Sequence, residues 1–227
     1  MANICIIGDS WGTINGFPAQ THIETNLHLE HFLKDAGHCV QNFSIPAGSN
    51  CQSISAIQSY LMDLIFRGKQ SDFPEYIIWF HTESLRDYSE DMGPYCINEI
   101  TETLCIQAYQ QFKELLNFTK AKAVVIGGQA PIMIDHFDRI VGKVDFLIED
   151  WHSEILEVKL PFTHVVCYIK FIESALCKDS VQEKNRILNN MEYILDLDKQ
   201  SNYFPDHCHP GTVPHQNLFN KIKNIFN

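Results

Sequence analysis

The chain has 227 residues, of which 45% are hydrophobic, and this size and composition predict a single globular domain, residues 1–227, with an ordinary core. Its formal net charge of −11 is opposite in sign to the basic patches that bind phosphate groups, so nucleic acid is not an expected partner. No apolar run is long enough to span a bilayer, and the amino terminus lacks the basic and hydrophobic regions of a signal segment. We therefore expect a cytoplasmic protein without a membrane partner.

The first predicted element lies in Asn3–Trp11, a stretch whose short apolar run ends abruptly in Gly8-Asp9-Ser10. A continuous apolar run of this length is typical of a strand buried on both faces, and Gly-Asp-Ser supplies the turn that ends it. Helix and strand periodicities then alternate, over a helix at Thr21–Ala36, a strand at His38–Ser44, a loop at 45–50, a helix at Gln52–Phe66, a strand at Tyr76–Phe80, a helix at Pro94–Thr119 and a strand at Ala121–Ile126.

The remainder of the chain begins with its least regular part, Gln129–Phe162, which we expect to be a long insertion with one short helix near Glu149–Val158. A fifth strand is predicted at His164–Ile169 and a helix at Val181–Leu195, and Pro214 opens a last helix.

Strands that alternate with helices along the whole chain predict an α/β fold with a parallel sheet covered on both faces. A flavodoxin-like strand order, 2-1-3-4-5, would place a crevice between the first and third strands. Ser10 and the segment His81–Ser84 would then be neighbours across that crevice, although the sequence separates them widely.

Ser10 is the first candidate for chemistry, because ligands bind at the carboxyl ends of the strands in open α/β sheets. A helix N-cap is an equally weighted alternative, since Asp and Ser are preferred capping residues. A serine hydroxyl needs a base, and the base works best when a carboxylate orients it. Asp206 and His209 near the end of the chain offer such a pair, at a spacing that lets both side chains point the same way in a turn.

A metal site is the alternative for Asp206-His207-Cys208-His209, because all four side chains can bind zinc. Adjacent residues rarely converge on one ion, and no second cluster has ligand spacing, so we predict no metal there. The eight cysteines are scattered without a Cys-x-x-Cys motif, and Cys5 and Cys167 lie in apolar runs. This pattern favours reduced, mostly buried thiols over disulfides.

Three motifs taken together resemble the SGNH (GDSL) hydrolase family. Gly8-Asp9-Ser10, the glycine of Pro46-Ala47-Gly48-Ser49-Asn50 and the Asp206-x-x-His209 pair look like the first, second and fifth sequence blocks of that family, in order and spacing over nearly the whole chain. The resemblance implies a three-layer α/β/α fold with a central parallel five-stranded sheet. It also implies a serine esterase activity, commonly the deacetylation of carbohydrates or the hydrolysis of simple esters, with no cofactor.

The same resemblance assigns roles by position. Ser10 would be the nucleophile, His209 the general base and Asp206 its orienting acid. The backbone N–H groups of Ser10 and Gly48 would donate to the oxyanion.

The third block departs from the family pattern. His81-Thr82-Glu83-Ser84 stands where the family usually has Gly-x-Asn-Asp, so Glu83 occupies the position of an amide that donates to the oxyanion. Loss of one such donor typically costs about 3 kcal/mol of transition-state stabilisation. Glu83 can be protonated and donate, can turn away to pair with Arg86 and leave Thr82 or His81 as donor, or can mark a protein that lost catalysis. We rank the pairing with Arg86 first.

The expected function is hydrolysis of a carboxylic ester through an acyl-Ser10 intermediate, with a small-molecule or carbohydrate ester as substrate. The alternatives are a non-catalytic binding or assembly protein with the same fold, and an acyltransferase that uses the same triad. Three aromatic residues near the expected site have two interpretations each. Trp11 either walls the pocket or packs against the first helix, and Trp151 and Phe146 either form a lid or anchor the long loop.

Overall fold

The computed structural model describes residues 1–12, 27–46, 48–82, 87, 97–128, 132–156 and 210–226. A parallel sheet of five strands in the order β2-β1-β3-β4-β5 forms its centre. The strands are β1 (Asn3–Ile7), β2 (Cys39–Asn42), β3 (Tyr76–His81), β4 (Lys122–Gly127) and β5 (Phe146–Ile148). The predicted α/β class and the flavodoxin-like strand order are both confirmed.

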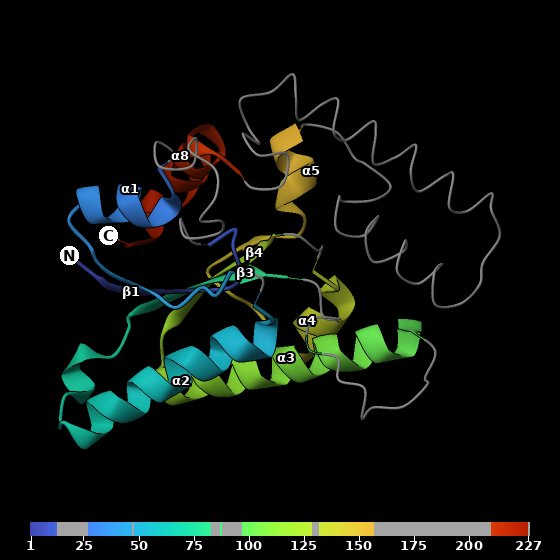
Figure 1. Ribbon diagram of the computed structural model, residues 1–227, viewed down its shortest axis with the longest axis horizontal. Helices are drawn as coiled ribbons and strands as arrows, with labels where there is room; N and C mark the ends of the chain where they lie inside the picture. Colours follow the sequence, from blue (N-terminus) through green and yellow to red (C-terminus); the bar gives the residue numbers. More distant parts are fainter. Residues whose placement is uncertain are drawn as a thin grey trace.

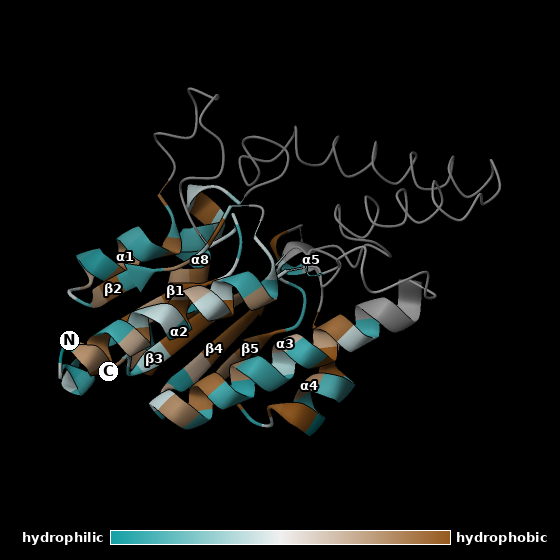
Figure 2. Cartoon of the chain, turned by 60° about the horizontal axis from the view of Figure 1, so that its bottom comes forward, coloured by the Kyte–Doolittle hydropathy of each residue, from teal (hydrophilic) through white to brown (hydrophobic). Residues whose placement is uncertain are grey.

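The three inner strands are buried on both faces, as their continuous apolar sequences predict. All six residues of β3 are buried, and so are all but the first residue of β1 and of β4. The edge strands β2 and β5 are only partly buried. Figure 2 shows this contrast, since β3 and β4 carry hydrophobic colours whereas β2 is partly hydrophilic.

Helices cover both faces of the sheet and complete three layers (Figure 1). One face carries α1 (Leu29–Asp35), α5 (Trp151–Leu156) and α8 (Thr212–Ile222), and the other carries α2 (Asn50–Phe66), α3 (Ile97–Thr119) and α4 (Ile134–Ile140). Two short 3-10 helices, η2 (Gln70–Asp72) and η5 (Lys223–Phe226), follow α2 and α8. Each face of the sheet buries its own hydrophobic cluster, so the inner strands are fixed from both sides.

The fifth strand lies where the sequence indicated an irregular stretch. Within Gln129–Phe162 the structure describes 132–156, and these residues form α4, β5 and α5. The expectation of irregular chain was wrong because β5 has three residues, too few to show a strand period, while the short helix expected near Glu149–Val158 is confirmed as α5. The strand predicted at His164–Ile169 and the helix predicted at Val181–Leu195 lie outside the described residues, and the single domain with an insertion stays a prediction.

Among the cysteines in the described ranges, Cys5 and Cys105 are buried, Cys51 is half-buried and Cys39 is exposed, and no disulfide joins them. Within the same ranges no helix combines the length and the apolar character that crossing a bilayer requires.

The topology creates one switch point, at the carboxyl ends of β1 and β3. Ile7 of β1 lies beside Trp79 of β3 in the sheet, and the chain leaves β1 toward β2 on one side before it returns to β3 on the other. Ligands of open α/β sheets bind at such a point.

Candidate active site

The loop that carries Ser10 begins with a glycine pressed against the neighbouring strand. Gly8 has a φ of +143°, and a Cβ placed there would lie 2.6 Å from the carbonyl oxygen of Phe80 and 2.7 Å from its Cβ. Only glycine adopts this backbone and accepts this approach. The chain therefore turns sharply as it leaves β1, and Ser10 stays close to the end of β3.

A tight turn of residues 9–12 then presents Ser10. The backbone N–H of Gly12 donates to the carbonyl oxygen of Asp9 at 3.1 Å, and the N–H of Trp11 donates to Oδ1 of the Asp9 carboxylate at 2.9 Å. Ser10 thus sits between two hydrogen bonds that Asp9 accepts, and only 4% of its surface is exposed. The alternative in which Asp9 or Ser10 caps a helix concerns the residues after Gly12, which lie outside the described part.

Both ends of this turn are tied to the chain that follows β2. The N–H of Ile45 donates to the carbonyl oxygen of Gly8 at 2.9 Å. The side-chain amide of Asn42, at the end of β2, donates to the carbonyl oxygen of Gly12 at 2.7 Å and to Glu30 at 2.8 Å. The segment 42–45 consequently holds the residue before the turn, Gly8, and the last residue of the turn, Gly12.

Thr82 joins the turn from the end of β3. Its hydroxyl donates to Oδ2 of Asp9 at 2.9 Å, and its backbone is bound twice by the side chain of Asn50. The Thr82 N–H donates to Oδ1 of Asn50 at 3.0 Å, and Nδ2 of Asn50 donates to the Thr82 carbonyl at 2.7 Å. Asp9, Thr82 and Asn50 are fully buried. The strand order predicted that Ser10 and His81–Ser84 would be neighbours, and the structure brings Asp9, next to Ser10, against Thr82.

Gly48, a predicted donor to the oxyanion, lies in the loop before α2. Its N–H donates to the carbonyl oxygen of Ile45 at 2.7 Å, and a Cβ there would come within 2.8 Å of that oxygen. Ser49 caps α2 through a capping box, in which its hydroxyl accepts from the N–H of Gln52 while the Gln52 side chain accepts from the N–H of Ser49. This box fixes Asn50 as the first residue of the helix.

The remaining predicted site residues fall outside the described part of the chain. These are Asp206 and His209 of the proposed triad and Glu83 of the third block, together with Arg86. The described chain resumes at Pro210, directly after His209, and Gly211 precedes α8. The hydroxyl of Thr212 in α8 accepts from the N–H of Leu27 at 2.9 Å, so the start of α8 is tied to the segment before α1.

Sequence reasoning identified Ser10 and Thr82 but missed three residues that organise this edge, Asp9, Asn42 and Asn50. Asp9 was visible within Gly-Asp-Ser, and Ser49-x-x-Gln52 is a capping signal that places Asn50 at a helix start. Nothing in the sequence pairs Asn50 with the backbone of Thr82, because that contact depends on how α2 packs beside β3.

The aromatic residues near the turn belong to the core. Trp11 and Trp151 are each 2% exposed and meet edge to face with ring centroids 5.8 Å apart. Phe146 lies in β5 and packs against the same cluster. Trp151 is therefore an anchor, one of the two interpretations expected for it, and Trp11 packs in the hydrophobic layer that also contains α1.

Two buried histidines lie in this aromatic layer. The rings of His28 and His215 are 4.5 Å apart, and Trp151 lies 5.2 Å from His215. Burial, and to a lesser extent the neighbouring His28, hold the pKa of His215 well below its ordinary value. His215 is therefore neutral near pH 7.

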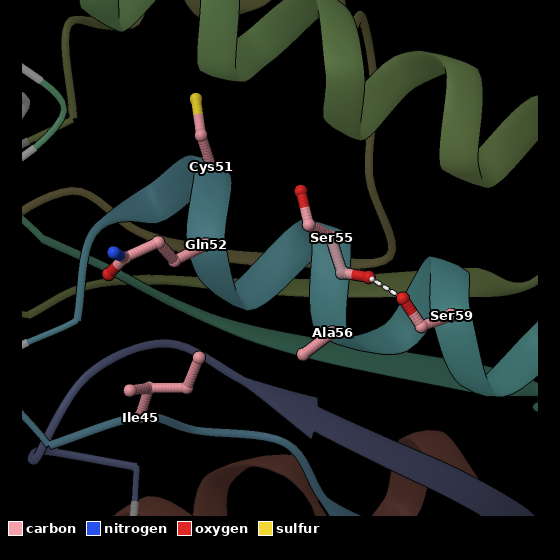
Figure 3. A pocket seen from close by; sticks show the side chains of 6 residues that line it. All are labelled: Ile45, Cys51, Gln52, Ser55, Ala56 and Ser59. Carbon is pink, nitrogen blue, oxygen red and sulfur yellow. Dashed lines mark hydrogen bonds between the residues drawn. The ribbon is translucent and has the colours of Figure 1, made fainter.

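A shallow groove of about 480 Å³ runs along the first two turns of α2 (Figure 3). Its lining consists of Ile45, Cys51, Gln52, Ser55, Ala56 and Ser59. In this view Ile45 lies below α2, across from the α2 side chains that line the groove, and its backbone N–H donates to the carbonyl oxygen of Gly8 at 2.9 Å. Burial and the neighbouring Asp87 raise the pKa of Cys51 to about 12, so this thiol is not a nucleophile at neutral pH.

The described residues do not point to a metal centre. Among them, no three His, Cys, Asp or Glu side chains gather closely enough to hold a metal ion. The alternative of a zinc site at Asp206–His209 lies outside them.

Comparisons with known proteins agree with this architecture at the level of the fold. No protein-family profile and no curated protein sequence matches the chain. Among solved structures, the psychrotrophic esterase EstA from Pseudoalteromonas sp., inhibited by monoethylphosphonate, superposes with a TM-score of 0.51 at 11% identity over 98% of both chains. TesA gives a TM-score of 0.44 at 15% identity over 87% of this chain and 98% of its own. The SGNH-hydrolase family esterase AlinE4 gives 0.38 at 17% identity over 99% of this chain and 95% of its own. The likeness to EstA shows that this chain has the α/β fold of that esterase.

Proposed function

We propose that this chain is a serine hydrolase that cleaves a carboxylic ester through an acyl-Ser10 intermediate. The observation that carries the proposal is the placement of Ser10, in a turn held on three sides at the carboxyl end of β1, next to the end of β3. A hydroxyl at the switch point of an open α/β sheet is where such folds bind and transform ligands.

The reaction needs a base for the Ser10 proton. His209 takes this proton as Ser10 attacks the ester carbonyl, and it returns the proton to the leaving alcohol. Asp206 orients the imidazole and stabilises its cation. Water activated by the same His209 then hydrolyses the acyl-Ser10 ester and releases the acid. No cofactor or metal takes part in these steps.

The developing oxyanion needs donors, and two of the expected ones are already bonded in the structure. Gly48 donates its N–H to Ile45, so it serves the oxyanion only if this bond opens as the tetrahedral intermediate forms. The Thr82 hydroxyl donates to Asp9. The N–H of Ser10 is the third expected donor. A protonated Glu83 would donate a fourth hydrogen bond to the oxyanion, whereas a Glu83 paired with Arg86 would not.

The proposed substrate is a small-molecule ester, including O-acetyl groups on carbohydrates. Acidic net charge argues against nucleic acid as a partner. The groove beside Ile45 lies close to the turn, and its lining combines apolar Ile45 and Ala56 with Ser55 and Ser59, which suits a short acyl chain or a hydroxylated alcohol.

A fluorophosphonate probe tests the proposal, because it reacts with activated serines and with few unactivated ones. We expect stoichiometric labelling at Ser10 and its disappearance in Ser10→Ala and His209→Ala, with both variants folded by circular dichroism. Hydrolysis of p-nitrophenyl esters of increasing acyl length, alongside acetylated sugars, then gives the substrate class. A folded wild-type protein that is neither labelled nor active on any ester would contradict the proposal.

Two alternatives keep the same fold. Glu83 at an oxyanion position motivates a non-catalytic binding protein, which predicts no labelling in the experiment above. An acyltransferase would use the same Ser10 and His209 but would give product only when an acceptor alcohol is added.

A further inference from the structure

The Asp9 carboxylate has no access to solvent. Its residue is 0% exposed, and each of its oxygens accepts a hydrogen bond from a different segment. Oδ1 accepts from the Trp11 N–H in its own turn, and Oδ2 accepts from the Thr82 hydroxyl at the end of β3, both at 2.9 Å. A buried charge is costly unless such bonds compensate it, so its place in the fold requires both donors.

The same residue closes the Ser10 turn with its backbone. The Asp9 carbonyl accepts from the Gly12 N–H at 3.1 Å, while the carboxylate accepts from the Trp11 N–H. Ser10 lies between these two bonds in sequence. A different backbone conformation at Ser10 would break one of these two hydrogen bonds. Asp9 therefore fixes the direction in which the chain turns at Ser10 after β1.

The partner of the carboxylate is itself fixed by regular structure. Thr82 follows directly after β3, and its N–H and carbonyl are both bound by Asn50, the first residue of α2. The position of the Asp9 carboxylate thus depends on a strand and a helix rather than on the loop alone. Side chains held in this way give a functional group a more defined position than loop contacts do.

We infer that Asp9 is a positioning residue for Ser10, and that Thr82 acts on catalysis through Asp9 rather than by donating to the substrate. A threonine hydroxyl has one proton, and here that proton goes to the carboxylate. The inference rests on the proposed function. It changes the expected role of Thr82 from oxyanion donor to support of the nucleophile turn.

The kinetic test uses Thr82→Val, which keeps the shape of the side chain and removes its donor, with Thr82→Ser as rescue. With p-nitrophenyl acetate we expect kcat of Thr82→Val to fall about 100-fold, the scale of a 1 Å misplacement, while KM stays within about threefold. Thr82→Ser should remain within about fivefold of wild type in kcat. The matched control is Thr119→Val, because the Thr119 hydroxyl donates to the Leu115 carbonyl in α3, away from the switch point. Wild-type kcat in a folded Thr82→Val protein would overturn the inference.

Asp9→Asn separates the two roles of Thr82. The Asn amide keeps one acceptor oxygen where the carboxylate had two, so it cannot accept from both the Trp11 N–H and the Thr82 hydroxyl as the carboxylate does; when its oxygen faces Trp11, the Thr82 hydroxyl becomes available to an oxyanion. If Thr82 supports the turn through Asp9, Asp9→Asn and Thr82→Val both lose kcat. The kcat of the double variant then stays within about threefold of the lower of the two single-variant values. Retained or raised kcat in Asp9→Asn, or additive losses in the double variant, would assign Thr82 to the oxyanion instead.

Hydrogen exchange keeps the inference testable even if the proposed function fails. The Trp11 amide should exchange at least about tenfold faster in Thr82→Val than in wild type or Thr119→Val, because its acceptor loses support. Absence of ester hydrolysis with this faster exchange would reject the hydrolase and keep the positioning contact. Unchanged exchange of Trp11 would reject the positioning role whatever the activity.

Discussion

Two buried polar clusters flank the centre of the molecule, and they differ in how their polar atoms are satisfied. In the first, Asp9, Thr82 and Asn50 are linked by four hydrogen bonds among themselves and the turn. In the second, the tilted rings of His28, just before α1, and His215, in α8, lie against each other, and neither ring nitrogen of His215 makes a hydrogen bond in the described structure.

Burial therefore has a different structural effect in each cluster. Directed hydrogen bonds fix the Asp9 cluster in one geometry, so its members specify where the chain turns. The His215 ring is held by packing against Phe80 and Trp151, and its buried nitrogens weaken the fold relative to an apolar ring. Substitutions should therefore be severe in the first cluster and mild in the second.

The largest effect is expected at Gly8, whose backbone brings the turn against β3. Gly8→Ala places a Cβ 2.6 Å from the Phe80 carbonyl oxygen at a φ of +143°, so the strand pair must separate. We expect the free energy of unfolding to fall by more than about 4 kcal/mol, measured by urea titration. Gly68→Ala is the matched control, because Gly68 also has a positive φ but an open Cβ position. Its cost should be about 1 kcal/mol, and equal losses at both sites would show that contact with β3 does not matter.

A smaller loss is expected when Asn50 is shortened. Asn50→Ala leaves the buried N–H and carbonyl of Thr82 without their side-chain partners, and each unsatisfied group costs about 1 to 3 kcal/mol. The free energy of unfolding should fall by about 3 kcal/mol in urea titration. Asn220→Ala serves as control, since Asn220 is exposed and bonds only Lys223 among the contacts described, and it should change stability by less than about 0.5 kcal/mol. Similar values for the two variants would contradict the structural role of Asn50.

The fold could be predicted from the sequence where apolar runs were long enough to show their period. Strands β1 and β3 are continuous apolar runs, and α2 has a capping signal at one end and Gly68 after the other. Strand β5 was not predicted, because its three residues are too few to show a period. Its place in the sheet comes from pairing with β4 through Val124 and Phe146. Tertiary pairing, not local sequence, makes it a strand.

The candidate site could be predicted only in part. Gly8-Asp9-Ser10 indicated the turn and the strand order brought Thr82 to it, but the bond from Thr82 to Asp9 joins residues 73 positions apart. Side-chain direction at this range depends on packing, which a single sequence does not encode locally. The expectation that the Thr82 hydroxyl faces the substrate arose from the motif, whereas its proton goes to the carboxylate in the fold.

The second cluster supplies the smallest effect and a dependence on pH. His215→Phe keeps a ring against Trp151 and removes two buried nitrogens, so at pH 7.5 the variant should be equal to wild type or more stable by about 1 kcal/mol. Because the pKa of His215 is lowered in the folded protein, the unfolded chain binds a proton below pH 6.5 that the folded chain does not. Wild type should therefore lose stability as the pH falls through 6.5, and between pH 7.5 and 5.5 this residue should account for about 1.4 kcal/mol.

The measurement is urea unfolding of both proteins at pH 7.5, 6.5 and 5.5. The informative quantity is the difference between wild type and His215→Phe in how steeply the free energy of unfolding changes with pH. All other groups are common to the two proteins, so the part of the loss that disappears in His215→Phe belongs to His215 and its coupling to His28. Parallel slopes would mean that the folded protein protonates His215 as readily as the unfolded chain does, which requires water or a polar partner at the ring. In that case the two clusters would be alike, and burial without hydrogen bonds would not distinguish the His215 ring from the Asp9 cluster.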